Sequence, residues 1–130
     1  INPGGTMNEG ANPVQGNVSA TRTLSTGVLE SFGLIGFDIN AAGAAPGVTT
    51  TLRKTGVAST GNGNQSIKRY FDVNPTVNTG LNAAIGLSYV VPELNGITET
   101  ALWLNKSTNS GTSWAGQQGG PVRESLFKLR

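Results

Sequence analysis

The 130-residue chain contains neither cysteine nor histidine. Their absence excludes disulfides, zinc or haem sites built on these side chains, cysteine nucleophiles and Ser-His-Asp triads. A catalytic site would have to use a pair of carboxylates. The 7 acidic residues are spread along the chain. Because side chains alternate between the two faces of a strand, no two of these acidic residues are expected on the same face of one strand. We therefore expect a protein that is not an enzyme and that has neither a cofactor nor a metal site.

Charge is also scarce, because only 12% of the residues are charged and the formal net charge is +2. Nucleic-acid binding needs clustered Lys and Arg, so we expect no nucleic-acid partner. No apolar run approaches the roughly 18 residues of a membrane span, so membrane insertion is not expected. Thr, Ser, Asn and Gly make up the polar positions instead, a composition common in extracellular repeat proteins.

Apolar and polar residues alternate with a period of two in several segments, which is the pattern of half-buried β-strands. The predicted strands are 83–91, 67–74, 34–39, 17–24, 48–58, 101–105 and 122–129, with a short edge strand at 6–9. Clusters of Gly, Asn, Pro and Ser separate them at intervals of about 10 residues. The sequence therefore predicts an all-β fold, an antiparallel β-sandwich (immunoglobulin-like or jelly-roll-like) of about 7–9 short strands. We expect a single domain over 17–130, preceded by a linker or donor-strand arm at 1–16.

The segment Ser107–Trp114 resembles the Asp-box, Ser-x-Asp-x-Gly-x-Thr-Trp, with Asn109 in place of the acid and Ser113 in place of the Thr. The spacing suits a hairpin turn, because an Asn side chain accepts from backbone N–H groups and Gly111 can adopt a positive φ. The Asp-box is best known from sialidase propellers, and this chain is too short for a propeller. We therefore predict a structural turn built on Ser107, Asn109, Gly111, Ser113 and Trp114.

Three other patterns each have a structural interpretation beside a functional one. The run Lys68–Phe71 mixes bases with aromatics as single-strand binders do, but Arg69 and Phe71 share one strand face, which favours an Arg stem at the rim of the core. The run Asp72–Asn74 offers calcium ligands but lacks the Gly and the final Glu of an EF-hand. Trp103 and Trp114 stand in apolar strand contexts, which favours core packing over a platform for sugar stacking.

Several short segments, taken in sequence order, resemble a β-sandwich module of large, multidomain proteins that Bacteroidetes and related bacteria export by type IX secretion. They are Asn8–Val14, Phe32–Gly36, Ile39–Gly47, Gly63–Asp72, Asn78–Ala83, Glu93–Gly96 and the Asp-box-like turn. The resemblance covers nearly the whole chain, from about Thr6 to Leu129. It implies an extracellular or cell-surface location and a structural or adhesive role, and it offers no catalytic residues to carry over.

Modules of this kind continue into one more strand, whereas this chain stops at Arg130. We interpret the chain as a fragment of a longer polypeptide or as a subunit whose open edge a neighbouring chain or segment completes. The residues expected at such an edge or arm are Thr6, Met7, Asn8, Glu9, Leu126, Phe127 and Leu129.

The function predicted from the sequence is that of a non-catalytic subunit or repeat of a surface fibre or filament, which self-associates or contacts adjacent domains of the same polypeptide. The alternative is a polysaccharide-binding accessory module of a larger secreted enzyme. An exposed Trp103 or Trp114 would favour this alternative.

Overall fold

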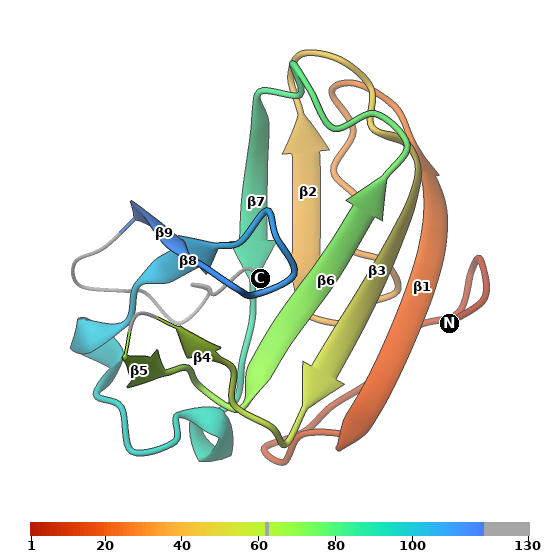
Figure 1. Ribbon diagram of the computed structural model, residues 1–130. Helices are drawn as coiled ribbons and strands as arrows, with labels where there is room; N and C mark the ends of the chain where they lie inside the picture. The colour runs from red at the N-terminus through yellow and green to blue at the C-terminus, as the bar shows by residue number, and fades with distance from the viewer. Residues whose placement is uncertain (62, 119–130) are drawn as a thin grey trace.

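The strands of this protein pair in antiparallel fashion throughout residues 1–61 and 63–118, the part that the computed structural model describes. A three-stranded sheet has the order β1-β3-β6, with β1 at Gly16–Leu24, β3 at Gly47–Thr55 and β6 at Arg69–Pro75. A two-stranded sheet pairs β2 (Phe37–Ala41) with β7 (Ala83–Leu87). Figure 1 shows the second sheet beside the first. The predicted all-β fold is confirmed.

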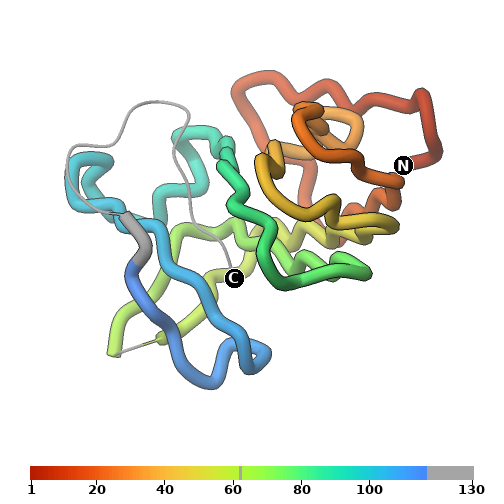
Figure 2. Tube along the Cα trace, turned by 90° about the horizontal axis from the view of Figure 1, so that it is seen from above, coloured from red at the N-terminus to blue at the C-terminus, as the bar shows by residue number. Residues whose placement is uncertain are grey.

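Two short hairpins lie beside these sheets. One pairs β4 (Thr60–Gly61) with β5 (Asn64–Gln65), and the other pairs β8 (Leu104–Lys106) with β9 (Ala115–Gln118). The helical elements of the described residues are two 3₁₀ turns, η1 (Val91–Glu93) and η2 (Glu99–Ala101). Figure 2 shows that the β8–β9 hairpin and the N-terminus lie on opposite sides of the molecule.

Strand β3 is the centre of the larger sheet, and its composition explains its extended form. The run Thr49–Thr51 is β-branched, which favours the pleated conformation. Alternate residues from Thr49 to Thr55 are buried, so one face of β3 looks into the core. In the register of the sheet, Arg53 lies opposite Phe71 of β6.

The main core lies between the two larger sheets. Its buried residues are Ala20, Leu24, Phe32, Ile35, Phe37, Ile39, Phe71, Leu87 and Leu104. The ring of Phe37 lies 5.7 Å from that of Phe32 and 5.8 Å from that of Phe71, measured between centroids. Aromatic pairs at this separation add to the stability that burial itself provides.

Several predicted strands are shorter than expected, and one is not formed. Of the strand predicted at 101–105, Leu104 and Asn105 lie in β8, whereas Ala101 belongs to η2. The strand predicted at 48–58 ends at Thr55, because Gly56 turns the chain with a φ of 93°. The strand predicted at 83–91 ends at Leu87, and the chain then turns into η1, where Glu93 is buried. Residues 6–9 form no strand, although Met7 N donates to Gly33 O over 2.8 Å.

The N-terminal segment contacts the larger sheet. The guanidinium of Arg22 on β1 donates to Ile1 O over 3.1 Å and to Asn2 O over 3.2 Å. Ile1 and Met7 also pack against the main core. These contacts attach residues 1–7 to the domain that they precede.

Candidate functional site

The Asp-box-like segment forms the turn between β8 and β9. Asn109 Oδ1 accepts from Ser113 N over 3.0 Å, and Ser107 Oγ accepts from Gly111 N over 2.8 Å. Ser110 and Gly111 have φ values of 57° and 82°, in the region that glycine adopts without strain. Asn109 Nδ2 also donates to Ser113 Oγ over 2.9 Å, whereas an Asp carboxylate at this position could only accept from the serine hydroxyl. These bonds explain why the chain reverses at this point.

The tryptophans lie outside the main core, which corrects the expectation that both pack in it. Trp103 is 53% exposed, whereas its neighbours Leu102 and Leu104 are 0% and 9% exposed. The alternation of an extended chain therefore turns the indole away from the core. Trp114 is half-buried and packs on Gly61 of β4, where a Cβ atom would overlap its ring.

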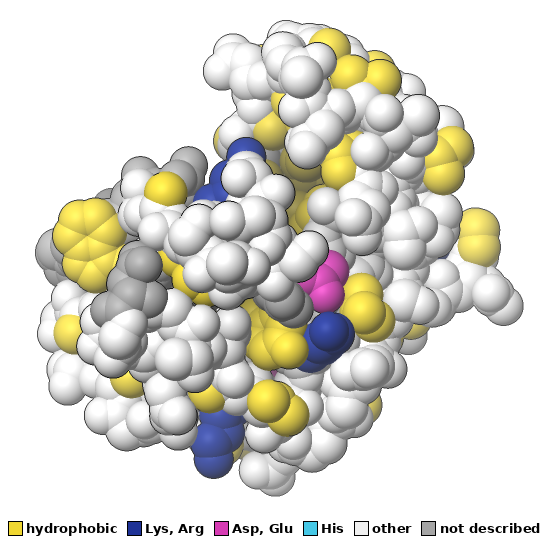
Figure 3. Space-filling model, in the orientation of Figure 1, with side chains coloured by type: hydrophobic (Ala, Val, Ile, Leu, Met, Phe, Trp, Pro, Cys, Tyr) yellow, Lys and Arg dark blue, Asp and Glu magenta, His cyan; other side chains and the backbone are white. Residues whose placement is uncertain are grey.

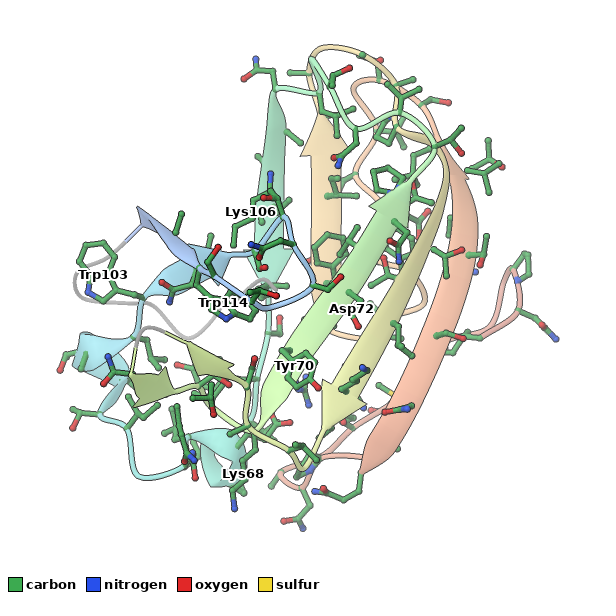
Figure 4. The ribbon with its side chains drawn as sticks, viewed as in Figure 1. Lys68, Tyr70, Asp72, Trp103, Lys106 and Trp114 are labelled. Carbon is green, nitrogen blue, oxygen red and sulfur yellow. The ribbon has the colours of Figure 1, made fainter. Side chains whose placement is uncertain are left out.

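An aromatic pocket of about 400 Å³ lies between the two short hairpins. We use the name "aromatic pocket" for the site formed by the aromatic residues Tyr70, Trp103 and Trp114 and the amide residues Asn64, Gln65 and Asn105, which are among its lining residues. Figure 4 shows Trp103 at the outer end of the β8–β9 region and Trp114 between it and Tyr70. The site therefore combines three aromatic rings with hydrogen-bonding amides.

A larger groove of about 1270 Å³ lies between β6 and β7 and reaches the β8–β9 turn. Its apolar lining includes Phe37, Ile39, Val73, Ile85 and Leu104. Figure 3 shows hydrophobic side chains gathered in a hollow of this face. Phe37, Ile39 and Leu104 belong to the buried main core, so the groove reaches down to that core, while Val73 and Ile85 are half-buried.

Strand β7 borders this groove and pairs with β2 alone among the described strands. Ile39 of β2 exchanges both backbone hydrogen bonds with Glu30, at 3.0 Å each. Backbone groups alternate in direction along an antiparallel strand, so the N–H and C=O groups of Ala83, Ile85 and Leu87 point away from β2. The second edge of β7 is therefore an open position for another strand in the part of the chain that is described.

Four buried or nearly buried charges form an arginine cluster, consisting of Glu9, Arg53, Arg69 and Glu93. Glu9 Oε2 accepts from Arg53 Nη1 over 2.8 Å and from Arg69 Nη2 over 2.9 Å. Arg69 Nε donates to Glu93 Oε1 over 2.8 Å. The side chains of Arg53, Arg69 and Glu93 are at most 2% exposed, and that of Glu9 is 11% exposed. The prediction that Arg69 shares the inner face with Phe71 is confirmed, but its guanidinium is buried rather than at the rim.

Backbone groups complete the arginine cluster. Arg53 also donates to Ile35 O and Val14 O, and Glu93 Oε2 accepts from Val90 N over 2.8 Å. Burial would raise the pKa of the Glu9 carboxyl, but the hydrogen bonds from Arg53 and from Val14 N and the charges of Arg69 and Arg53 outweigh it. The pKa of Glu9 therefore lies below its ordinary value, and its carboxylate is held in the charged form.

Two sets of positions remain: the Asp72–Asn74 run, for which the sequence favoured a structural role over calcium binding, and the predicted assembly residues. Asp72 pairs with Lys54 over 3.4 Å, and residues 1–61 and 63–118 contain no group of three acidic side chains that could hold a metal ion. Of the predicted assembly residues, Glu9 lies in the arginine cluster, while Leu126, Phe127 and Leu129 lie outside the described residues. Within the same ranges, no helix is long and apolar enough to cross a membrane.

Comparison with protein-family models, with curated proteins and with solved structures found no match to this chain. The resemblance to a secreted bacterial module therefore stays a prediction.

Proposed function

We propose that this protein is a non-catalytic structural or adhesive module of an extracellular protein, and that it assembles through β-strand contacts. The observation that carries the proposal is the open edge of β7 beside the groove, whose lining combines apolar side chains with polar and charged ones such as Lys54, Asp72 and Lys106. An open strand edge offers a ladder of hydrogen bonds to an incoming chain, and the apolar part of the groove next to it can bury alternate side chains. Together they provide both parts of a site for strand addition.

The occupant that we propose is an extended segment of a neighbouring copy of the chain. The sequence 122–129 was predicted as a strand, and it supplies Leu126, Phe127 and Leu129. Apolar residues two positions apart, such as Phe127 and Leu129, would enter the groove from one face of such a strand. The low charge and the resemblance to a secreted module support an extracellular or cell-surface location.

The arginine cluster is consistent with a structural role. Its two carboxylates, Glu9 and Glu93, each bind the guanidinium of Arg69. A carboxylate that is held in buried ion pairs is poorly placed to exchange a proton with a substrate, and its loss would leave a buried charge without a partner. The pairing of Glu9 and Glu93 through Arg69 thus has a structural explanation.

The test is assembly of the purified chain, measured by light scattering after size exclusion and by negative-stain electron microscopy. We expect concentration-dependent oligomers or filaments from the wild-type chain. Ala83→Lys places a charge at the open edge of β7 in the groove and should abolish them. Ala44→Lys is the matched control, because Ala44 is also exposed but lies outside the groove lining. A monomeric wild-type chain at high concentration, or equal assembly of both variants, would overturn the proposal.

A further inference from the structure

None of the residues in 1–61 and 63–118 that line the aromatic pocket has a charged side chain. Their polar groups include the amides of Asn64, Gln65 and Asn105, two serine hydroxyls and the hydroxyl of Tyr70. A charged ligand would lose its hydration there without gaining a countercharge. The pocket is therefore suited to a neutral ligand rich in hydrogen-bonding groups.

Trp103 provides an exposed aromatic face. The indole is 53% exposed and lies over Gly116 of β9, where a Cβ atom would be 3.5 Å from Trp103 Cε3. Exposing a large apolar ring to water is unfavourable, so a ligand that covers the ring gains free energy. Because the ring already packs on Gly116, fixing it on binding costs little conformational entropy. Such a ring can stack against the C–H face of a flat, partly apolar molecule.

Asn105 places a hydrogen-bond acceptor next to this ring. Its Nδ2 donates to Trp103 O over 3.0 Å, which fixes the orientation of the carboxamide. A Cβ atom placed on Gly116 would lie 3.9 Å from Asn105 Oδ1 and 3.5 Å from Trp103 Cε3, so the amide oxygen and the indole lie over the same residue. An aromatic face and a carbonyl acceptor are thus adjacent on one strand pair.

The second indole forms another wall of the same site. Trp114 lies on the backbone of Gly61 and is held by the β8–β9 turn, while Tyr70 comes from β6. In Figure 4, Trp114 lies between Trp103 and Tyr70. The rings come from separate elements, so the folded domain positions them before any ligand arrives.

We propose that the aromatic pocket binds a neutral carbohydrate, with a sugar ring stacked on Trp103 and a hydroxyl group donating to Asn105 Oδ1. A pyranose presents C–H groups on its face and hydroxyls at its edge, which matches an indole beside an amide. The volume of about 400 Å³ lies within the range of small-molecule sites. This activity goes beyond strand assembly, because the aromatic pocket and the edge of β7 use different residues.

The test is a titration of the full chain with cellohexaose, mannohexaose, xylohexaose and N-acetylchitohexaose, followed by tryptophan fluorescence and calorimetry. The chain has 2 tryptophans and both line the aromatic pocket, so fluorescence reports on this site alone. We expect at least one of these neutral oligosaccharides to bind and to change the emission. Trp103→Ala should weaken binding roughly 10-fold or more, and Asn105→Ala should weaken it less.

The matched control is Leu29→Ala, which also removes an exposed apolar side chain but lies outside the aromatic pocket. It should leave binding unchanged, and Trp103→Ala should assemble as the wild-type chain does. Failure of all four oligosaccharides to bind at millimolar concentration would overturn the proposal. Preference for an acidic polysaccharide such as polygalacturonate, or for a proline-rich peptide, would also overturn it.

Discussion

The arginine cluster and the aromatic pocket are both rich in polar groups, but they differ in charge and in exposure. In the arginine cluster, the guanidiniums of Arg53 and Arg69 are buried and bound to carboxylates. In the aromatic pocket, the described lining residues are uncharged and Trp103 is 53% exposed. The buried charges are paired with one another, although Arg53 Nε has no hydrogen-bond partner among the described residues, whereas the exposed ring of Trp103 is accessible to a ligand.

The largest effect is expected from removing one carboxylate of the arginine cluster. Glu93→Ala leaves Arg69 without the partner of its Nε, in a position that water does not reach. Loss of one member of a buried ion pair costs about 3–5 kcal/mol of unfolding free energy. Urea denaturation followed by far-UV circular dichroism measures it.

The control for this prediction is the more exposed ion pair between Lys54 and Asp72. Lys54→Met keeps the aliphatic stem and removes the charge, and it should change the unfolding free energy by less than about 1 kcal/mol. The side chains of this pair are 29% and 30% exposed, against 2% for both partners of Arg69–Glu93. Equal losses in the two variants would show that burial does not distinguish the two ion pairs.

The arginine cluster was also the feature that the sequence revealed least. The alternation that predicted the strands also placed Arg69 correctly beside Phe71, because that relation is local. The ion pairs of Arg69, however, reach Glu93, 24 residues away, and Glu9, 60 residues away. Such pairings depend on the sheet order, which periodicity does not determine. The available signals were the two arginines at inward strand positions, Arg69 of β6, which the alternation placed, and Arg53 of β3.

The aromatic pocket was partly predictable. The β8–β9 turn could be predicted from the spacing of Ser107, Asn109 and Gly111, because the hydrogen bonds and the positive φ that form the turn all lie within a few residues. Trp103 was expected in the core, although the leucines on either side of it would have indicated the opposite face. The packing of Trp114 on Gly61 joins two hairpins that are distant in sequence, and no local pattern encodes it.

Acid should destabilise the domain through Glu9. The pKa of Glu9 is lowered in the folded protein, so its contribution to stability is present above its unfolded pKa and is lost as pH falls through the folded pKa. Glu9→Gln should cost up to about 3 kcal/mol at pH 7, and less at low pH. Urea midpoints of both proteins between pH 7 and pH 2 test this. Parallel curves would contradict the assignment of this acid sensitivity to Glu9.

Removing the amide of the β8–β9 turn should have a smaller and more local effect. Asn109→Ala deletes the acceptor of Ser113 N and the donor to Ser113 Oγ, which are exposed bonds. We expect a loss of about 1 kcal/mol, together with altered tryptophan emission, because the turn positions Trp114. Thr112→Ala, in the same turn, is the control and should change neither quantity. Unchanged emission in Asn109→Ala would show that the turn does not support the aromatic pocket.

The smallest effect is expected at Asp38, an acid outside the arginine cluster. Burial, and then the charge of Glu30, raise the pKa of Asp38, so the folded domain disfavours its charged form. A raised folded pKa means that the wild-type chain gains stability as pH falls through that pKa, which is the opposite sign to Glu9. Asp38→Asn removes the charge and should therefore be slightly more stable than the wild-type chain at pH 7, by less than about 1 kcal/mol. The advantage should vanish at pH 3, where Asp38 of the wild-type chain is largely protonated. A lower stability of Asp38→Asn at pH 7 would show that the Asp38 carboxylate has a favourable partner. Asp38 would then not differ from the carboxylates of the arginine cluster in the way proposed.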